Sequence, residues 1–168
     1  MKYAEVREQI KTGDVLLVES GQLFGVLIRI LTAQQISHVA MFLWIDKSLF
    51  LVDITASKDY QLVPASLRLR QLDKKAKLYW GKAPEPVASC TKLAAAALRY
   101  REMDPEYSYF TLLLVWWGQL RKRSTPSRLV CSTLVARLWS LCGFRFAYTP
   151  DPGDYMFLSK EVAYLERV

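Results

Sequence analysis

The stretch "SHVAMFLWIDKSLFLVDIT", residues 37–55, decides the fold class. Two runs of aliphatic, aromatic and β-branched residues, 37–45 and 49–55, flank the polar residues "DKS". Two such runs joined by a short polar turn are typical of an antiparallel β-hairpin. Because side chains alternate along a strand, His38 shares one face of the first run with Ala40. The sequence therefore predicts a sheet with His38 at the start of one of its strands.

Asp53 is the only charged residue in "LFLVDIT", the second strand of the hairpin. An ionised side chain in an apolar strand is costly unless it is paired or hydrogen-bonded. A loop of two or four residues places Asp53 opposite Ala40, diagonal to His38 and on its face, with about 7–8 Å between the backbones. A three-residue loop pairs Asp53 with Met41 and sends it to the other face. The alternative interpretation of Asp53 is a carboxylate at a sheet edge that meets solvent.

The other patterns predict a single domain over residues 1–168, because this length suits one sizeable core. Further strands are expected at 15–20, 60–64 and 76–80, and helices within 2–11, 23–33, 84–103, 105–120 and 131–142, followed by a turn at 150–153 and one short terminal helix. A strand is the alternative for 23–33, and "RQLDKK" (70–75) is expected to be a charged loop. Strands that cluster first, with helices afterwards, are typical of an α+β domain in which an antiparallel sheet packs against helices.

The composition predicts a globular protein with a positive charge. Hydrophobic residues make up 52% of the chain and charged residues 23%, and 23 Lys and Arg against 16 Asp and Glu give a net charge of +7. This excess favours an anionic partner, such as nucleic acid, an acidic polymer or an anionic membrane surface, and does not choose among them. No groove-reading helix, RNP-like block or zinc module is visible, so no specific nucleic-acid partner is expected.

Neither a signal peptide nor a membrane span is predicted. The first segment, "MKYAEVREQIKTGDV", carries charges throughout and lacks an apolar centre. The most apolar run, "YFTLLLVWW" (109–117), is about half as long as a spanning helix. We therefore expect a cytoplasmic protein whose thiols are free in a reducing compartment.

The three cysteines, Cys90, Cys131 and Cys142, match neither a zinc motif nor a disulfide-rich scaffold. Cys90 lies on an apolar helix face and Cys142 in the last turn of a predicted helix, so both are expected to be small buried core residues. Cys131 opens that last helix, where unpaired N–H groups and the positive end of the helix dipole stabilise a thiolate. The alternative for Cys131 is again a buried core residue. Neither a metal nor a cofactor is expected.

The only histidine, His38, supplies with Asp53 and Cys131 the parts of a cysteine nucleophile system. In such a system His38 accepts the proton of the Cys131 thiol, and Asp53 fixes the imidazole tautomer. A histidine with a satisfied structural role is the alternative. The sequence thus predicts that three residues far apart along the chain meet in the fold.

Four blocks carry a resemblance to a known family: "TGDVLLVES" (12–20), "ISHVAMFLW" (36–44), "FLVDIT" (50–55) and "LVCSTLVARLW" (129–139). In this order they resemble the bacterial YiiX/YaeF-like proteins. These are circularly permuted papain-fold proteins of the NlpC-type superfamily, related to the lecithin:retinol acyltransferase group. The resemblance covers essentially the whole chain in motif order, and it implies a permuted papain-like fold.

The resemblance also assigns roles to three residues. The family has a general base on the Ser-His strand, a carboxylate on the next strand and a Cys-Ser nucleophile at the start of a helix, and these roles fall on His38, Asp53 and Cys131. The family more often has Glu at the position of Asp53 and at that of Thr133. The implied activity is that of a cysteine hydrolase of the amidase or peptidase type. It would cleave an amide or ester through an acyl-enzyme on Cys131, with the Cys131 N–H as one oxyanion donor.

The resemblance implies a small substrate: a peptide such as a cell-wall peptide, another amide or a lipid, with anionic substrates favoured by the charge. Two alternatives stay open. One is a lipid acyl hydrolase or acyltransferase. The other is a non-enzymatic basic module that binds a membrane or a polymer, because Trp116 and Trp117 precede "RKR" (121–123), a combination found in surface-seeking helices. A buried helix is the plain interpretation of these aromatic residues. The oligomeric state is not predicted.

Overall fold

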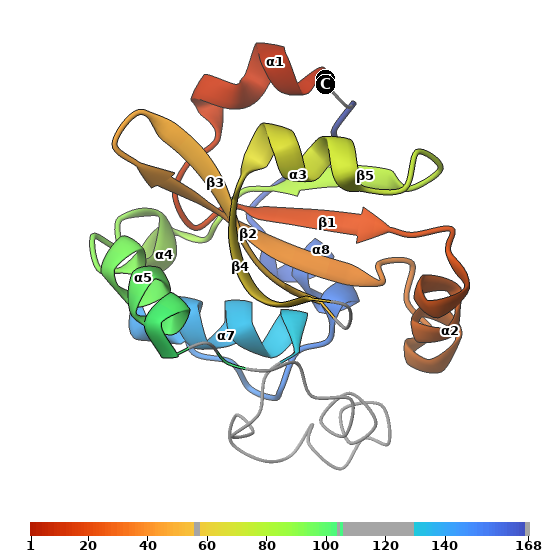
Figure 1. The fold of residues 1–168 in the computed structure, drawn as a ribbon. Coiled ribbons are helices and arrows are strands. Elements are labelled where there is room, and N and C mark those ends of the chain that lie inside the picture. Colours follow the sequence, from red (N-terminus) through yellow and green to blue (C-terminus); the bar gives the residue numbers. More distant parts are fainter. Residues whose placement is uncertain (56–57, 104, 106–129, 167–168) are drawn as a thin grey trace.

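The computed structural model of the protein describes residues 1–55, 58–103, 105 and 130–166. Its centre is a six-stranded antiparallel sheet with the strand order β4-β3-β2-β1-β5-β6. The strands are β1 Val15–Glu19, β2 His38–Ile45, β3 Ser48–Thr55, β4 Lys58–Pro64, β5 Lys77–Gly81 and β6 Val162–Tyr164. Helices flank this sheet (Figure 1), so the predicted α+β class is confirmed.

The hairpin of β2 and β3 has the register that brings His38 and Asp53 to one face. Its loop is the two-residue turn Asp46-Lys47, in which Asp46 adopts φ = +51°, the left-handed conformation that short hairpin turns require. The paired residues, from the turn outward, are Ile45 with Ser48, Trp44 with Leu49, Leu43 with Phe50, Phe42 with Leu51 and Met41 with Val52. The next pair in this register is Ala40 with Asp53. The prediction for a two-residue loop is therefore confirmed, and the three-residue alternative is wrong.

Helices cover both faces of the sheet, with α3 on one side and α7 on the other (Figure 1). One face packs against α5 (Leu93–Met103) and α7 (Cys131–Leu141). The other face packs against α1 (Tyr3–Val6) and α3 (Ala65–Gln71). The α7 face carries Val15, Leu17, Val39, Met41, Val52 and Ile54, and the α3 face carries Leu16, Val18, Ala40, Phe42, Leu49 and Leu51. Because side chains alternate along a strand, Asp53 of β3 belongs to the α3 face.

The remaining elements agree with the sequence in part. They are the 3-10 helix Arg7–Gln9 that extends α1, α2 Leu23–Thr32, α4 Glu85–Ala88, the 3-10 helix Pro152–Asp154 and α8 Tyr155–Leu158. The segment 23–33 is thus a helix and not a strand, and the predicted short terminal helix is α8. The helix predicted at 105–120 lies outside the described residues from 106 onward, as do the apolar run 109–117 and the "RKR" segment 121–123.

Three features of the secondary structure differ from the prediction. The helix expected at 84–103 is divided into α4 and α5. Ser89 is the C-terminal cap of α4, and its hydroxyl donates to the Glu85 carbonyl at 3.0 Å. The expected loop "RQLDKK" begins inside α3, a helix that was not predicted. The chain end adds β6, which pairs with β5.

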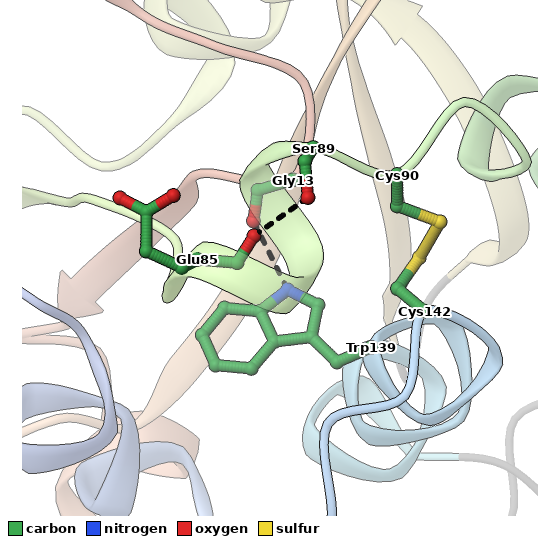
Figure 2. Close-up of a disulfide and its surroundings, with 6 residues drawn as sticks. All are labelled: Gly13, Glu85, Ser89, Cys90, Trp139 and Cys142. Carbon is green, nitrogen blue, oxygen red and sulfur yellow. Dashed lines mark hydrogen bonds between the residues drawn. A yellow bond between two sulfur atoms is a disulfide. The ribbon is translucent and has the colours of Figure 1, made fainter.

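A disulfide joins Cys90 to Cys142, which corrects the expectation that all thiols are free (Figure 2). Cys90 follows α4, and Cys142 is the C-terminal cap of α7. Both residues are half-buried, so neither is the fully buried core residue that was expected. Their Cα atoms lie 5.5 Å apart although they are 52 positions apart in the chain, a proximity that depends on how α7 packs and that spacing does not encode. Nearby, the Trp139 indole donates to the Gly13 carbonyl at 3.0 Å (Figure 2).

Within the described ranges, none of the helices combines the length and the apolar character that crossing a bilayer requires.

Candidate active site

Cys131 is the first residue of α7, as the sequence predicts. Val130 before it is extended, with φ −126° and ψ 171°, so the helix begins at Cys131. Thr133 fixes this start, because its hydroxyl oxygen accepts from the Val130 N–H at 2.9 Å and donates to the Val130 carbonyl at 3.1 Å. A Glu at the same position closes a capping box through the same N–H. Thr133 therefore makes the contact to the Val130 N–H that a Glu at this position would make.

Tyr155 of α8 holds the first turn of α7 from the side. Its hydroxyl donates to the Ser132 carbonyl at 2.8 Å. Tyr155 is fully buried, and burial raises its pKa well above 10, so the hydroxyl remains a donor. Cys131 itself is only 5% exposed. Tyr155 is not among the residues predicted from the sequence, because no local pattern links α8 to the start of α7.

The His38 imidazole and the Asp53 carboxylate are in direct contact. Nε2 of His38 lies 2.6 Å from Oδ1 of Asp53. The Asp53 side chain is 1% exposed and that of His38 is 18% exposed. With the carboxylate ionised, Nε2 carries a proton and donates it, which leaves Nδ1 for other partners. The hairpin register thus brings together the two residues that the sequence predicts to share a face.

Arg68 is a third member of this cluster, and it is not among the residues predicted from the sequence. It lies on α3, and its Nε and Nη2 both contact Oδ2 of Asp53 at 2.8 Å. One carboxylate oxygen therefore faces His38 and the other faces Arg68. The signal in the sequence was Asp53 itself, since a charge in an apolar strand requires a partner. That signal does not say which of the chain's basic residues the partner is.

Neighbouring charges shift the pKa values of His38 and Asp53 in opposite directions. Burial lowers the pKa of His38, but electrostatic interactions and hydrogen bonds with Asp53 and Cys131 raise it from 6.5 to about 10. Burial raises the pKa of Asp53, but His38 and Arg68 lower it from 3.8 to about 2. At neutral pH Asp53 is therefore an anion and His38 a cation.

Cys131 meets His38 where β2 and α7 both begin. A charge interaction and a side-chain hydrogen bond with Cys131 both raise the pKa of His38, so the sulfur lies beside the imidazole. Because Nε2 is engaged by Asp53, Nδ1 is the ring nitrogen left for the sulfur. The structure thus brings together all three residues that the sequence nominates, with His38 between the sulfur and the carboxylate.

The chain matches no protein-family model and no curated protein. Among solved structures it is similar to the crystal structure of metalloprotein YiiX from Escherichia coli O157:H7, with a TM-score of 0.59 and 20% sequence identity. The similarity covers 82% of this chain and 69% of that chain. At this identity the likeness shows the fold alone, so the protein has a YiiX-like α+β fold, and that part of the predicted resemblance is confirmed.

The word "metalloprotein" describes that neighbour, and the site residues of this chain do not fit a metal. Both oxygens of Asp53 are engaged, Oδ1 by His38 and Oδ2 by the guanidinium of Arg68. A cation at that carboxylate would meet the positive charge of Arg68. In the part of the chain that the structure describes, no group of three or more His, Cys, Asp or Glu residues is arranged to hold a metal ion.

Proposed function

We propose that the protein is a cysteine hydrolase of the amidase or peptidase type, built on a circularly permuted papain-like domain of the NlpC type. The observation that carries this proposal is the cluster of Cys131, His38 and Asp53, in which the His38–Asp53 contact is 2.6 Å and Asp53 is buried. A nucleophile, a base and a group that orients the base are the parts that such chemistry needs.

The proposed reaction starts from an ion pair in which Nδ1 of His38 has already taken the proton of Cys131, so that His38 is the cation that its raised pKa indicates. Asp53 accepts the hydrogen bond of Nε2–H and stabilises the resulting imidazolium. The sulfur then attacks the carbonyl carbon, and the imidazolium protonates the leaving amine or alcohol, which leaves a thioester on Cys131. Water, deprotonated by His38, hydrolyses the thioester and restores the thiol.

The start of α7 suits the negative oxygen that forms during attack. The backbone N–H of Cys131 lies in the first turn, where helical N–H groups have no partner within the helix. Thr133 and Tyr155 fix this turn through Val130 and Ser132, so the donor direction is set before substrate arrives. We propose that this N–H donates to the oxyanion.

The proposed substrates are small peptides, including cell-wall peptides, and other amides or esters, with anionic ones favoured by the net charge of +7. The membrane- or polymer-binding alternative depends on Trp116, Trp117 and the "RKR" segment, which lie outside the described residues.

An acyl-type activity probe with mass mapping tests this proposal. Cys131 should carry the label, because the other two cysteines are paired in a disulfide. His38→Ala should slow labelling near neutral pH by about 10²–10⁴-fold, and Cys131→Ala should abolish it together with turnover of a peptide and ester panel. Ser140→Ala, an exposed change near the far end of the same helix, is the matched control. Turnover that survives in Cys131→Ala would remove Cys131 from the mechanism, and unchanged labelling in His38→Ala would remove His38.

A further inference from the structure

The two carboxylate oxygens of Asp53 contact residues of two different elements, β2 and α3. Oδ1 lies 2.6 Å from Nε2 of His38, at the start of β2. Oδ2 accepts a hydrogen bond from Nε of Arg68, a residue of α3, at 2.8 Å, and Nη2 of the same guanidinium also lies 2.8 Å from Oδ2. Since α3 covers the face opposite α7, the cluster extends from Cys131 across the end of the sheet to Arg68.

This arrangement limits how the carboxylate can turn. The Asp53 side chain is 1% exposed and that of Arg68 is 15% exposed, so water has little access to either group. Nε of Arg68 donates a hydrogen bond to Oδ2, and Nη2 lies 2.8 Å from the same oxygen. The N–H groups of a guanidinium have fixed relative positions, so Arg68 restricts the acceptor more than a lysine ammonium would. With Oδ2 held by Arg68, Oδ1 is the oxygen that remains directed at His38.

Arg68 also adds charge to the same place. Charged groups act on Asp53 from two elements packed against β3: His38 of β2 and Arg68 of α3. Gln61, its neighbour on β4, carries no charge. Without Arg68, the buried carboxylate would keep only His38 as a cationic partner, and burial would then favour its protonated form.

We infer that Arg68 is a positioning residue of the site: from α3 it holds Asp53 so that Oδ1 faces His38. Arg68 touches neither the sulfur nor the imidazole in the contacts above, so it acts through Asp53. The inference deepens the proposed function and rests on it for the role of His38. The contact of Arg68 with Asp53 can be tested without any substrate.

Nuclear magnetic resonance of the full chain provides this test, because His38 is the only histidine and its ring signals need no assignment. Protonation of Asp53 should shift the ring signals of His38, and we call this shift the carboxyl step. In the wild type the pKa of Asp53 is lowered to about 2, so no carboxyl step should occur above pH 3. In Arg68→Gln the step should move up by about 1 to 3 pH units, since one of two cationic partners is lost. In Arg68→Gln the rate of Cys131 alkylation should also fall over the same pH interval, in which Asp53 becomes protonated.

Two further variants complete the experiment. Arg70→Gln removes a charge from an exposed position of the same helix and should leave the His38 titration unchanged. Arg68→Lys keeps the charge but not the planar pair of donors, so its carboxyl step should lie between those of the wild type and Arg68→Gln. If Arg68→Gln does not fold, the Arg68→Lys titration decides in its place.

A titration of Arg68→Gln or Arg68→Lys that superimposes on the wild type would overturn the inference, because a merely structural Arg68 changes stability and leaves the His38 signals in place. Failure of the proposed function looks different. A wild-type protein that turns over no amide or ester, and whose Cys131 reacts slowly with the probe, would remove the hydrolase assignment and leave this titration valid.

Discussion

Replacing Cys90 and Cys142 together by alanine opens the disulfide that ties the end of α4 to the end of α7. The bond closes a loop across 52 positions of the chain. The chain-entropy relation for a loop of that size gives a loss of about 4 kcal/mol in the free energy of unfolding. With a slope of about 2 kcal/mol per molar urea, the unfolding midpoint should fall by about 2 M.

Urea unfolding followed by tryptophan fluorescence measures this change, and a Cys131→Ala background prevents thiol exchange. The Cys131→Ala protein serves as the oxidised reference. Adding a reductant to that reference should reproduce the fall in midpoint, and adding it to the triple variant should change nothing. Equal midpoints for the reference and the triple variant would refute the loop-closure reasoning.

A thiol count tests the pairing itself. The unfolded, unreduced wild-type chain should titrate one thiol, because two of its three cysteines are bonded. After reduction it should titrate all three. Three thiols before reduction would refute the disulfide and restore the expectation from the sequence.

Three other predictions follow from the site and its support. Asp53→Asn should reduce kcat/KM less than Cys131→Ala does, because Asn still contacts the imidazole ring; an undiminished rate would make Asp53 structural. Stability should be greatest between pH 3.8 and 6.5, since the contribution of Asp53 is complete above 3.8 and is lost towards about 2, and that of His38 is complete below 6.5 and is lost towards about 10. Urea midpoints that rise from pH 7 to pH 9 would contradict this. Trp139→Phe removes the donor to the buried Gly13 carbonyl and should lower the free energy of unfolding by about 1 to 3 kcal/mol in the same assay.

The sequence could predict the part of the site that depends on local rules. Strand alternation and the length of the polar turn at Asp46-Lys47 determine that Asp53 lies on the face of His38. The position of Cys131 follows from the start of an amphipathic pattern, and the extended Val130 agrees with it. Each of these inferences uses neighbours within about twenty residues of one another.

The sequence could not predict the contacts that depend on tertiary packing. Arg68 is one of 23 basic residues, and only the docking of α3 on the sheet selects it as the partner of Asp53. Cys90 and Cys142 meet because α7 ends beside the segment that follows α4. The strand β6 is three residues long, too short for alternation to be visible, and it forms only because the chain returns to β5.

The Asp53–Arg68 ion pair is poorly explained by stability. Removing two charges from water is expensive, and apolar residues of similar volume often serve a core as well or better. Apolar residues would fit at positions 53 and 68, since Leu51 on the same face of β3 and Leu69 beside Arg68 are both buried in one apolar cluster. Apolar residues could not present a carboxylate to His38, and the pair does so at a contact of 2.6 Å. The charge in the middle of an otherwise apolar strand is therefore best explained by the site at the end of the sheet.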